Sequence, residues 1–132
     1  MASKYSNKKT ELQFQNQTYY FDSRLEASHA QVLFTMLKQG KISNLIFQKE
    51  FILCESTILR TNSTVSKKTK RSKIKYISDF YYEKDGKIIV ADSKGMKTAI
   101  YSLKKNLFLS QLKEHGVDEF QELYKAEIIK YW

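Results

Sequence analysis

Residues 75–94 read KYISDFYYEKDGKIIVADSK and contain two short apolar runs, each with one aspartate. The Asp85-Gly86 dipeptide between the runs is typical of a two-residue hairpin turn. The register that such a turn sets places Asp79 directly opposite Asp92, with Lys94 on the same face of the hairpin. Cross-strand neighbours lie only about 4.5–5.5 Å apart at Cβ, so two ionised aspartates repel each other unless a cation lies between them. The stretch therefore predicts a β-hairpin that carries a metal site suited to Mg²⁺.

The charge of the chain indicates a polyanionic partner. The 132 residues include 23 Lys and Arg against 14 Asp and Glu, a formal net charge of +9. An excess of this size gives information about the binding partners of a protein rather than about its fold. Nucleic acid is the first candidate partner. At this length, with 42% hydrophobic residues, one domain spanning 1–132 is expected.

Basic residues are concentrated in the middle of the chain. No acidic residue occurs from Ser56 to Ser78, and we expect a mobile basic loop at residues 60–73 that contacts DNA phosphates. Charge runs also serve solubility, which is the plainer explanation. The candidate DNA-binding residues in and beyond this loop are Lys67, Lys68, Lys70, Arg71, Lys73, Lys97, Lys104 and Lys105.

Several classes of protein are disfavoured by composition. No apolar run approaches the length of a membrane span, and the N-terminus lacks the apolar segment of a secretion signal, so an intracellular protein without membrane partners is expected. The single cysteine, Cys54, cannot form an internal disulfide and is expected to pack as a small apolar residue. His29 and His115 are isolated in sequence and are expected at the surface or at a helix end.

Hydrophobic periodicity predicts an α/β (α+β) chain with a mixed central sheet flanked by helices. A capping box at Ser23-Arg-Leu-Glu26 starts the first helix, and Gly40 stops it. The expected elements, in chain order, are a flexible basic arm at 1–11, an extended segment at Leu12–Phe21, a helix at Ser23–Gln39, a long or bent strand at Asn44–Leu59, strands at Ile74–Tyr82 and Lys87–Lys94, a helix at Thr98–His115, and a final strand marked by Phe120, Tyr124, Ala126 and Ile128.

The second helix is expected to pack on the sheet through one apolar stripe. This stripe comprises Ile100, Leu103, Leu107, Phe108 and Leu112.

The order of these elements and four short motifs resemble the PD-(D/E)XK nuclease superfamily, and within it small phage endonuclease-like proteins. The motifs are Tyr20-Phe-Asp-Ser23-Arg-Leu-Glu26-Ala, Gly40-Lys-Ile42-Ser-Asn-Leu45 with Gln48, Tyr76-Ile-Ser-Asp79-Phe, and Asp92-Ser-Lys94-Gly95. Two positions depart from the superfamily pattern, because Ser78 stands where its name has proline and Asp92 where glutamate is common. The resemblance spans roughly Tyr20 to Leu107 and implies a restriction-endonuclease-like αβββαβ core.

The resemblance also implies a role for each matching residue. Asp79 and Asp92 are the implied ligands of one or two Mg²⁺ ions, for which Mn²⁺ is expected to substitute. The backbone carbonyl of Ser93 is an additional implied ligand, and Glu26 is the third acid. Lys94 is the implied group that orients or activates the attacking water and stabilises charge on phosphorus.

Each of these roles competes with a plainer one. Asp79 is also explained as a structural aspartate bonded to a backbone N–H, Asp92 as the ion-pair partner of Lys94, and Lys94 itself as a solvent-facing lysine. Glu26 is also explained as the reciprocal half of the capping box with Ser23. Glu26 nevertheless shares the apolar face of its helix, which favours a position at the sheet.

The implied activity is metal-dependent hydrolysis of a DNA phosphodiester bond. A small basic chain of this kind suggests a structure-selective enzyme, such as a Holliday junction resolvase that acts on branched DNA as a homodimer in the recombination of a phage or prophage. Two alternatives stay open: a general or sequence-specific nicking endonuclease, and a nucleic-acid-binding module that does not cut. The opposed aspartates favour an enzyme, because binding alone gains nothing from them.

Overall fold

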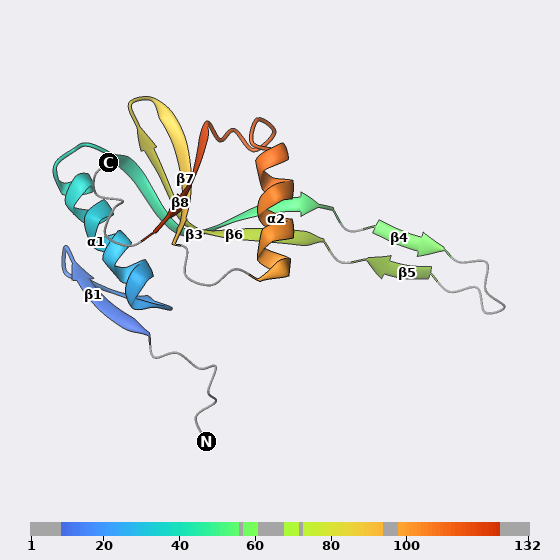
Figure 1. Cartoon of the computed structure of the whole chain (residues 1–132), viewed down its shortest axis with the longest axis horizontal. Helices are drawn as coiled ribbons and strands as arrows, with labels where there is room; N and C mark the ends of the chain where they lie inside the picture. The colour runs from blue at the N-terminus through green and yellow to red at the C-terminus, as the bar shows by residue number, and fades with distance from the viewer. Residues whose placement is uncertain (1–8, 56, 61–67, 72, 94–97, 125–132) are drawn as a thin grey trace, which may run out of the picture.

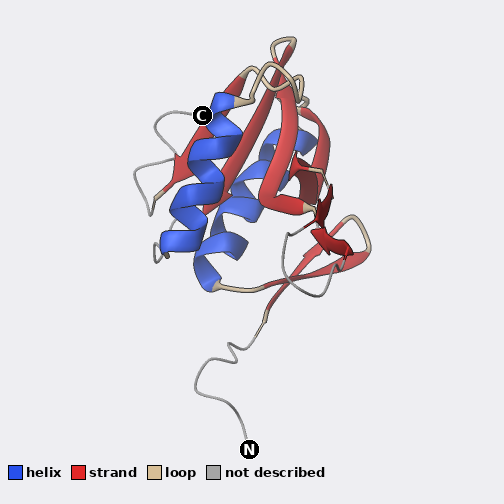
Figure 2. Ribbon diagram, turned by 90° about the vertical axis from the view of Figure 1, so that its right-hand side faces the viewer, coloured by secondary structure: helices blue, strands red, loops and turns tan. Residues whose placement is uncertain are grey.

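A four-stranded sheet in the order β3-β6-β7-β8 organises the fold (Figures 1 and 2). The computed structural model describes residues 9–55, 57–60, 68–71, 73–93 and 98–124. Neighbouring strands are antiparallel except β7 and β8, which are parallel and are connected through helix α2, so the predicted mixed sheet is confirmed. The bounds of these elements are β3 Ser43–Cys54, β6 Ile74–Lys84, β7 Lys87–Ser93, α2 Ala99–Ser110 and β8 Glu119–Leu123.

The β6–β7 hairpin has the predicted turn and register. Asp85 and Gly86 both adopt left-handed backbone conformations, with φ of 52° and 77°, as a two-residue turn of this type requires. Lys84 pairs with Lys87, and the ladder continues outward to Phe80 opposite Ala91. Asp79 and Asp92 therefore lie one step beyond the last pair of this ladder.

Helix α1, at Arg24–Lys38, confirms the first predicted helix. Ser23 is the N-cap, and its side chain accepts a hydrogen bond of 3.0 Å from the backbone N–H of Glu26. Gly40, with φ of 74°, ends the helix by donating its N–H to the carbonyl of Leu37. These local signals fix both ends of the helix.

Two hydrophobic clusters form on opposite faces of the sheet. Ile89 and Ala91 belong to the cluster under α1, whereas Val90 belongs to the cluster under α2. Because successive side chains of a strand point to opposite faces, the two helices cover opposite sides of β7. Figure 1 shows β7 and β8 lying between α1 and α2.

Helix α2 packs on the sheet with a different face from the one predicted. Phe108 is fully buried, but Ile100 and Leu103 are 68% and 62% exposed. The inward face carries Tyr101 and Lys105 beside Phe108, because polar groups on the sheet below need polar partners. The helix is also shorter than predicted and ends at Ser110. The apolar stripe expected at the sheet therefore lies largely at the surface.

The segment before α1 is a hairpin rather than a single extended segment. Strands β1 at Thr10–Phe14 and β2 at Gln17–Phe21 pair antiparallel around left-handed residues Gln15 and Asn16. Phe14 stacks on Phe34 of α1 with ring centroids 4.2 Å apart. The hairpin thereby packs against α1 and extends the hydrophobic cluster under this helix.

A two-stranded antiparallel ribbon stands where a loop at 60–73 was expected. Strand β4 at Thr57–Arg60 pairs with β5 at Lys68–Arg71. The ribbon extends away from the rest of the molecule, beyond α2 (Figure 1). Lys67 lies outside the described residues.

Candidate active site

Three acidic side chains from α1, β6 and β7 meet where the β6–β7 ladder ends. Asp79 Oδ2 accepts the backbone N–H of Ser93 at 2.9 Å, and Asp92 Oδ1 accepts the backbone N–H of Asp79 at 2.8 Å. Each aspartate side chain thus accepts a hydrogen bond from the backbone of the opposite strand. These bonds lie at the position where the next backbone pair of the ladder would form. Glu26, in the first turn of α1, shares a side-chain hydrogen bond with Asp79. The structure therefore brings Glu26, Asp79 and Asp92 together.

Glu26 belongs to the helix cap through its backbone and lies beside Asp79 through its side chain. Its backbone N–H belongs to the helix cap, as described above, while its carboxylate accepts a hydrogen bond from the backbone N–H of Asp22 as well as bonding Asp79. The side chain is almost fully buried. Capping and a place in the acidic site are thus compatible, because different atoms of Glu26 serve each.

The residue of β3 that lies opposite Asp79 has a left-handed backbone. Phe47 pairs with Phe80 and Lys49 with Ser78, but Gln48 between them adopts φ of 56° and has no ladder partner among the described residues. A left-handed conformation costs a residue with a side chain about 1–2 kcal/mol, so packing on both sides must hold it. This backbone conformation therefore occurs at the position of the β3–β6 pair that carries Asp79.

Two tyrosines lie beside Asp92 on its other side. Asp92 is 3% exposed, and Tyr76 donates its hydroxyl hydrogen to Oδ2. Tyr101, on the inward face of α2, interacts electrostatically with the Asp92 side chain. Burial beside Asp92 raises the pKa of both tyrosines far above the usual range, so both stay protonated. Neither tyrosine was assigned to the site from the sequence, because spacing alone does not show which aromatic residue faces a buried carboxylate.

An ion pair closes the α2 side of the site. Glu122 is the neighbour of Asp92 in the parallel β7–β8 pair, and its Oε1 lies 3.0 Å from Lys105 Nζ. The side chains of Lys105 and Glu122 are only 13% and 21% exposed. Lys105 was expected on an exposed DNA-binding track, but its ammonium is held by Glu122 within the domain.

His29 is buried, so its predicted surface position is wrong. It follows Glu26 by one helical turn, which places both on the inward face of α1. Its Nε2 lies 2.9 Å from the carbonyl oxygen of Tyr124, and its Nδ1 lies 2.6 Å from Ser93 Oγ. Burial lowers the pKa of His29, so the ring is neutral. Because a carbonyl only accepts, Nε2 carries the hydrogen and Nδ1 accepts from Ser93.

Burial of the acids raises their pKa values. Desolvation is the largest cause, and it raises the pKa of Asp79 to about 7, with Glu26 next in effect. Burial and then the charge of Asp79 raise the pKa of Asp92 to about 6, and burial also raises the pKa of Glu26. Within the described ranges, none of the three carboxylates forms an ion pair with a Lys, Arg or His. The site therefore has a strong electrostatic preference for a proton or a cation.

We expect this preference to appear in the pH dependence of stability. The pKa of Asp79 is about 7 in the folded protein but near 4 in the unfolded chain. The stabilising effect of its proton is complete below pH 4 and is lost as pH rises through 7. In a chelating buffer, Tm should therefore fall from pH 5 to pH 8, and it should fall less in Asp79→Asn. Equal pH slopes for the two proteins would contradict the raised pKa.

The donor set suits a hard divalent cation, although the arrangement is not a finished metal site. Carboxylate oxygens are the ligands that Mg²⁺ prefers, and a cation would replace the proton that Glu26 and Asp79 share. In the part of the chain that the structure describes, no three His, Cys, Asp or Glu side chains are grouped as a metal site. Each Asp92 oxygen accepts one hydrogen bond, from Asp79 N–H and from the Tyr76 hydroxyl respectively. A carboxylate oxygen has a second lone pair, so Asp92 could bind a metal while it keeps these hydrogen bonds.

The other candidate residues are placed as follows. Lys94 and Lys97 lie outside the described residues, while Ser93 is the last residue of β7 and partly buried. Lys73 is exposed just before β6, and Lys104 is half-buried on α2. Lys68, Lys70 and Arg71 all belong to strand β5.

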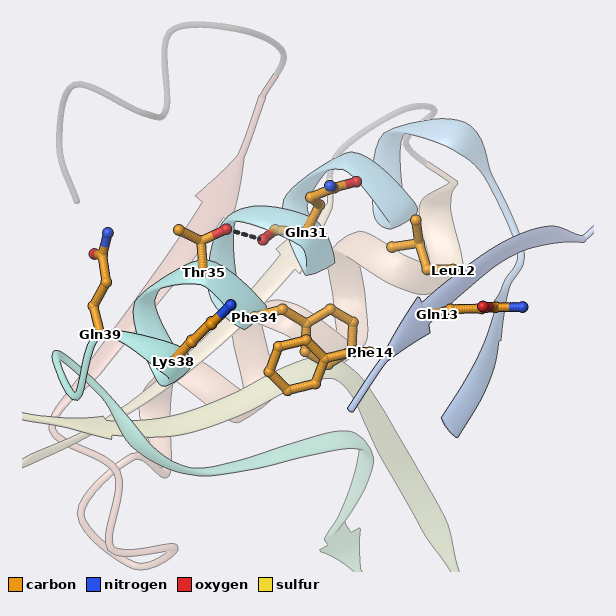
Figure 3. Close-up of a pocket in the computed structure, with 8 residues that line it drawn as sticks. All are labelled: Leu12, Gln13, Phe14, Gln31, Phe34, Thr35, Lys38 and Gln39. Atoms are coloured by element: carbon orange, nitrogen blue, oxygen red, sulfur yellow. Dashed lines mark hydrogen bonds between the residues drawn. The ribbon is translucent and has the colours of Figure 1, made fainter. Parts of the chain in front are cut away.

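A pocket between the β1–β2 hairpin and α1 lies apart from the acids. Figure 3 shows Phe14 and Phe34 stacked at its wall, with Thr35 bonded to the carbonyl of Gln31 and Lys38 near its edge. Its lining includes no acidic residue, so it offers no carboxylate ligand for a metal.

The chain belongs to the family described as a protein of unknown function (DUF1064), whose model matches residues 2–131. A comparison with curated proteins found no match. Among the described residues, no helix is long and apolar enough to cross a membrane.

Proposed function

We propose that this DUF1064 protein is a metal-dependent DNA endonuclease with a restriction-endonuclease-like core. One observation carries the proposal: three buried or half-buried carboxylates from separate elements lie close enough to interact electrostatically, and no described basic side chain neutralises them. Burying several carboxylates together destabilises the folded protein unless a bound ligand offsets their charge. Strongly shifted pKa values also cluster at functional sites. The motif resemblance gives the reaction class.

Asp79, Asp92 and Glu26 are the side chains that would hold Mg²⁺ or Mn²⁺, together with the backbone carbonyl of Ser93. The cation would lower the pKa of a water molecule and offset charge on the scissile phosphate. Tyr76 positions Asp92 by donating a hydrogen bond to it, and Tyr101 lies beside the same carboxylate. In the reaction, a water oxygen bonds to phosphorus, one phosphorus–oxygen ester bond breaks, and a proton passes to the leaving oxygen.

A branched DNA substrate is the favoured form within this proposal. A homodimer would present two such sites to the two symmetric cleavage points of a four-way junction. The corresponding setting is recombination or DNA processing by a phage or prophage in the cytoplasm of a bacterial host. The chain's net charge of +9 supports a nucleic-acid substrate of either the branched or the linear kind.

Cleavage assays on four substrates would test the proposal. The protein is incubated with four-way junction, linear duplex, single-stranded and supercoiled DNA, each with Mg²⁺ and with chelator. We expect cutting only with Mg²⁺, and preferentially of the junction. Nicking of supercoiled DNA without junction preference would favour a general nicking enzyme. Binding to these substrates without any cutting would favour a non-catalytic module and reject the proposal.

Lys94 is the proposed assistant to the attacking water. Lys94→Ala should depress cleavage by about 10²–10⁴-fold, the range typical of general acid–base catalysis, because it removes a group that acts in the transition state. Metal binding should survive, since an ammonium is not a metal ligand. Cleavage rates and the rise in Tm on adding Mg²⁺ would check both parts, with Lys87→Ala in the hairpin turn as the exposed control. If Lys94→Ala cleaved DNA as fast as the wild type, Lys94 would have no catalytic role and would be an ordinary surface residue.

A further inference from the structure

The β4–β5 ribbon concentrates positive charge on two paired strands. Its eight residues include Arg60, Lys68, Lys70 and Arg71 and no acid. Arg60 and Lys68 are direct partners in the antiparallel register. The nearest acidic residues in sequence are Glu55 and Asp79. Neutralising partners are therefore absent from the ribbon itself.

This arrangement is unfavourable for an isolated ribbon. A two-stranded sheet is marginally stable in water, and like charges directly opposite each other destabilise it further. The ribbon also extends away from the body of the protein, where no sheet covers it (Figure 1). An anionic partner along both strands removes the repulsion, and a nucleic-acid backbone supplies a regular series of such anions.

The length of the connecting chain sets an upper limit on the distance between the ribbon and the acids. The ribbon continues the β3–β6 pair, and Lys70 precedes Asp79 by nine residues. At a rise of roughly 3.3 Å per residue, the chain between them spans at most about 30 Å. This upper limit is slightly less than one turn of B-DNA, about 34–36 Å. A two-stranded ribbon is also one of the two elements that fit the major groove.

We propose that the β4–β5 ribbon occupies the major groove of a double-helical arm within about one turn of the phosphate bound at the acidic site. The substrate class is therefore duplex DNA with an arm of at least about ten base pairs on that side, rather than single-stranded DNA. The position of the scissile phosphate rests on the proposed nuclease function. The ribbon's own contact with duplex does not depend on cleavage.

Binding to duplexes of increasing length would test this inference. Affinity is measured in chelator, so that no cutting occurs, for duplexes of 6, 10, 14 and 20 base pairs and for single strands. Three proteins are compared: the wild type, a ribbon variant with Lys68→Gln, Lys70→Gln and Arg71→Gln, and a control with Lys38→Gln, Lys41→Gln and Lys87→Gln. The control removes the same charge from exposed lysines on α1, after α1 and in the hairpin turn.

We expect wild-type and control affinities to rise once the duplex exceeds about one turn, and the ribbon variant to lack this rise. Each lost phosphate contact should also reduce the slope of log K against log salt by about 0.9. An unchanged length dependence in the ribbon variant would overturn the inference, and so would an equal loss of single-strand binding. If the length dependence holds but Mg²⁺ supports no cutting, the nuclease proposal fails and the ribbon inference stands.

Discussion

Asp79→Asn is expected to abolish Mg²⁺-dependent cleavage while raising the stability of the metal-free protein at pH 8. The asparagine side chain can keep the hydrogen bond that Asp79 Oδ2 accepts from Ser93, and its amide can donate to Glu26. The change therefore replaces like-charge repulsion with a hydrogen bond. Loss of a residue that only supports a metal ligand lowers activity by up to about 100-fold. Loss of the ligand itself should therefore lower cleavage by at least about 100-fold.

Melting curves with Mg²⁺ and with chelator, run beside the cleavage assay, would measure both effects. Wild-type Tm should rise with Mg²⁺ because the ion binds only the folded state, and the variant's Tm should not respond. Asp22→Asn is the matched control: it removes a charge near Glu26, but its exposed side chain pairs with Lys9 outside the site. If Asp79→Asn lost stability yet retained cleavage, Asp79 would be a structural residue.

The largest expected loss of stability comes from Phe108→Ala. Phe108 is fully buried and packs against Phe51 and Tyr76, with ring centroids 4.7 and 4.8 Å away. Truncation of a buried phenylalanine costs about 3–5 kcal/mol, through lost burial and the cavity left behind. This side chain is the only buried residue of α2, so the helix that carries Tyr101 and Lys105 should loosen with it.

Urea unfolding of Phe108→Ala and of Leu103→Ala would measure this dependence. Leu103 is on the same helix but largely exposed, so its loss should change the free energy of unfolding by less than about 0.5 kcal/mol. Similar decreases in the free energy of unfolding of the two variants would mean that α2 packs through its apolar stripe, which would contradict the structure.

Local signals predicted the elements that they control directly. The turn at Asp85-Gly86 sets the β6–β7 register through two backbone conformations, and the Ser23 cap and Gly40 set the ends of α1. The N-terminal hairpin was missed because Gln15-Asn16 lacks the glycine that usually marks such a turn.

Tertiary requirements explain what the sequence did not predict. Counting apolar residues selected Leu103 for the core, but the acids on the sheet require hydrogen-bond donors, so α2 turns Tyr101 and Lys105 inward. The left-handed backbone of Gln48 has no local signal, because glutamine does not favour this conformation. Long-range packing therefore decided the details of the site.

The acids lie on the seam between the two hydrophobic clusters. Glu26 is anchored in the cluster of α1, and Asp92 is tied through Tyr76 and Tyr101 to the cluster of α2, with Asp79 between them. Each half of the molecule supplies part of the site, so its geometry depends on how the halves sit against each other. A ligand bound by all three acids would connect the two clusters, and its binding would rigidify the whole domain as well as fill the site.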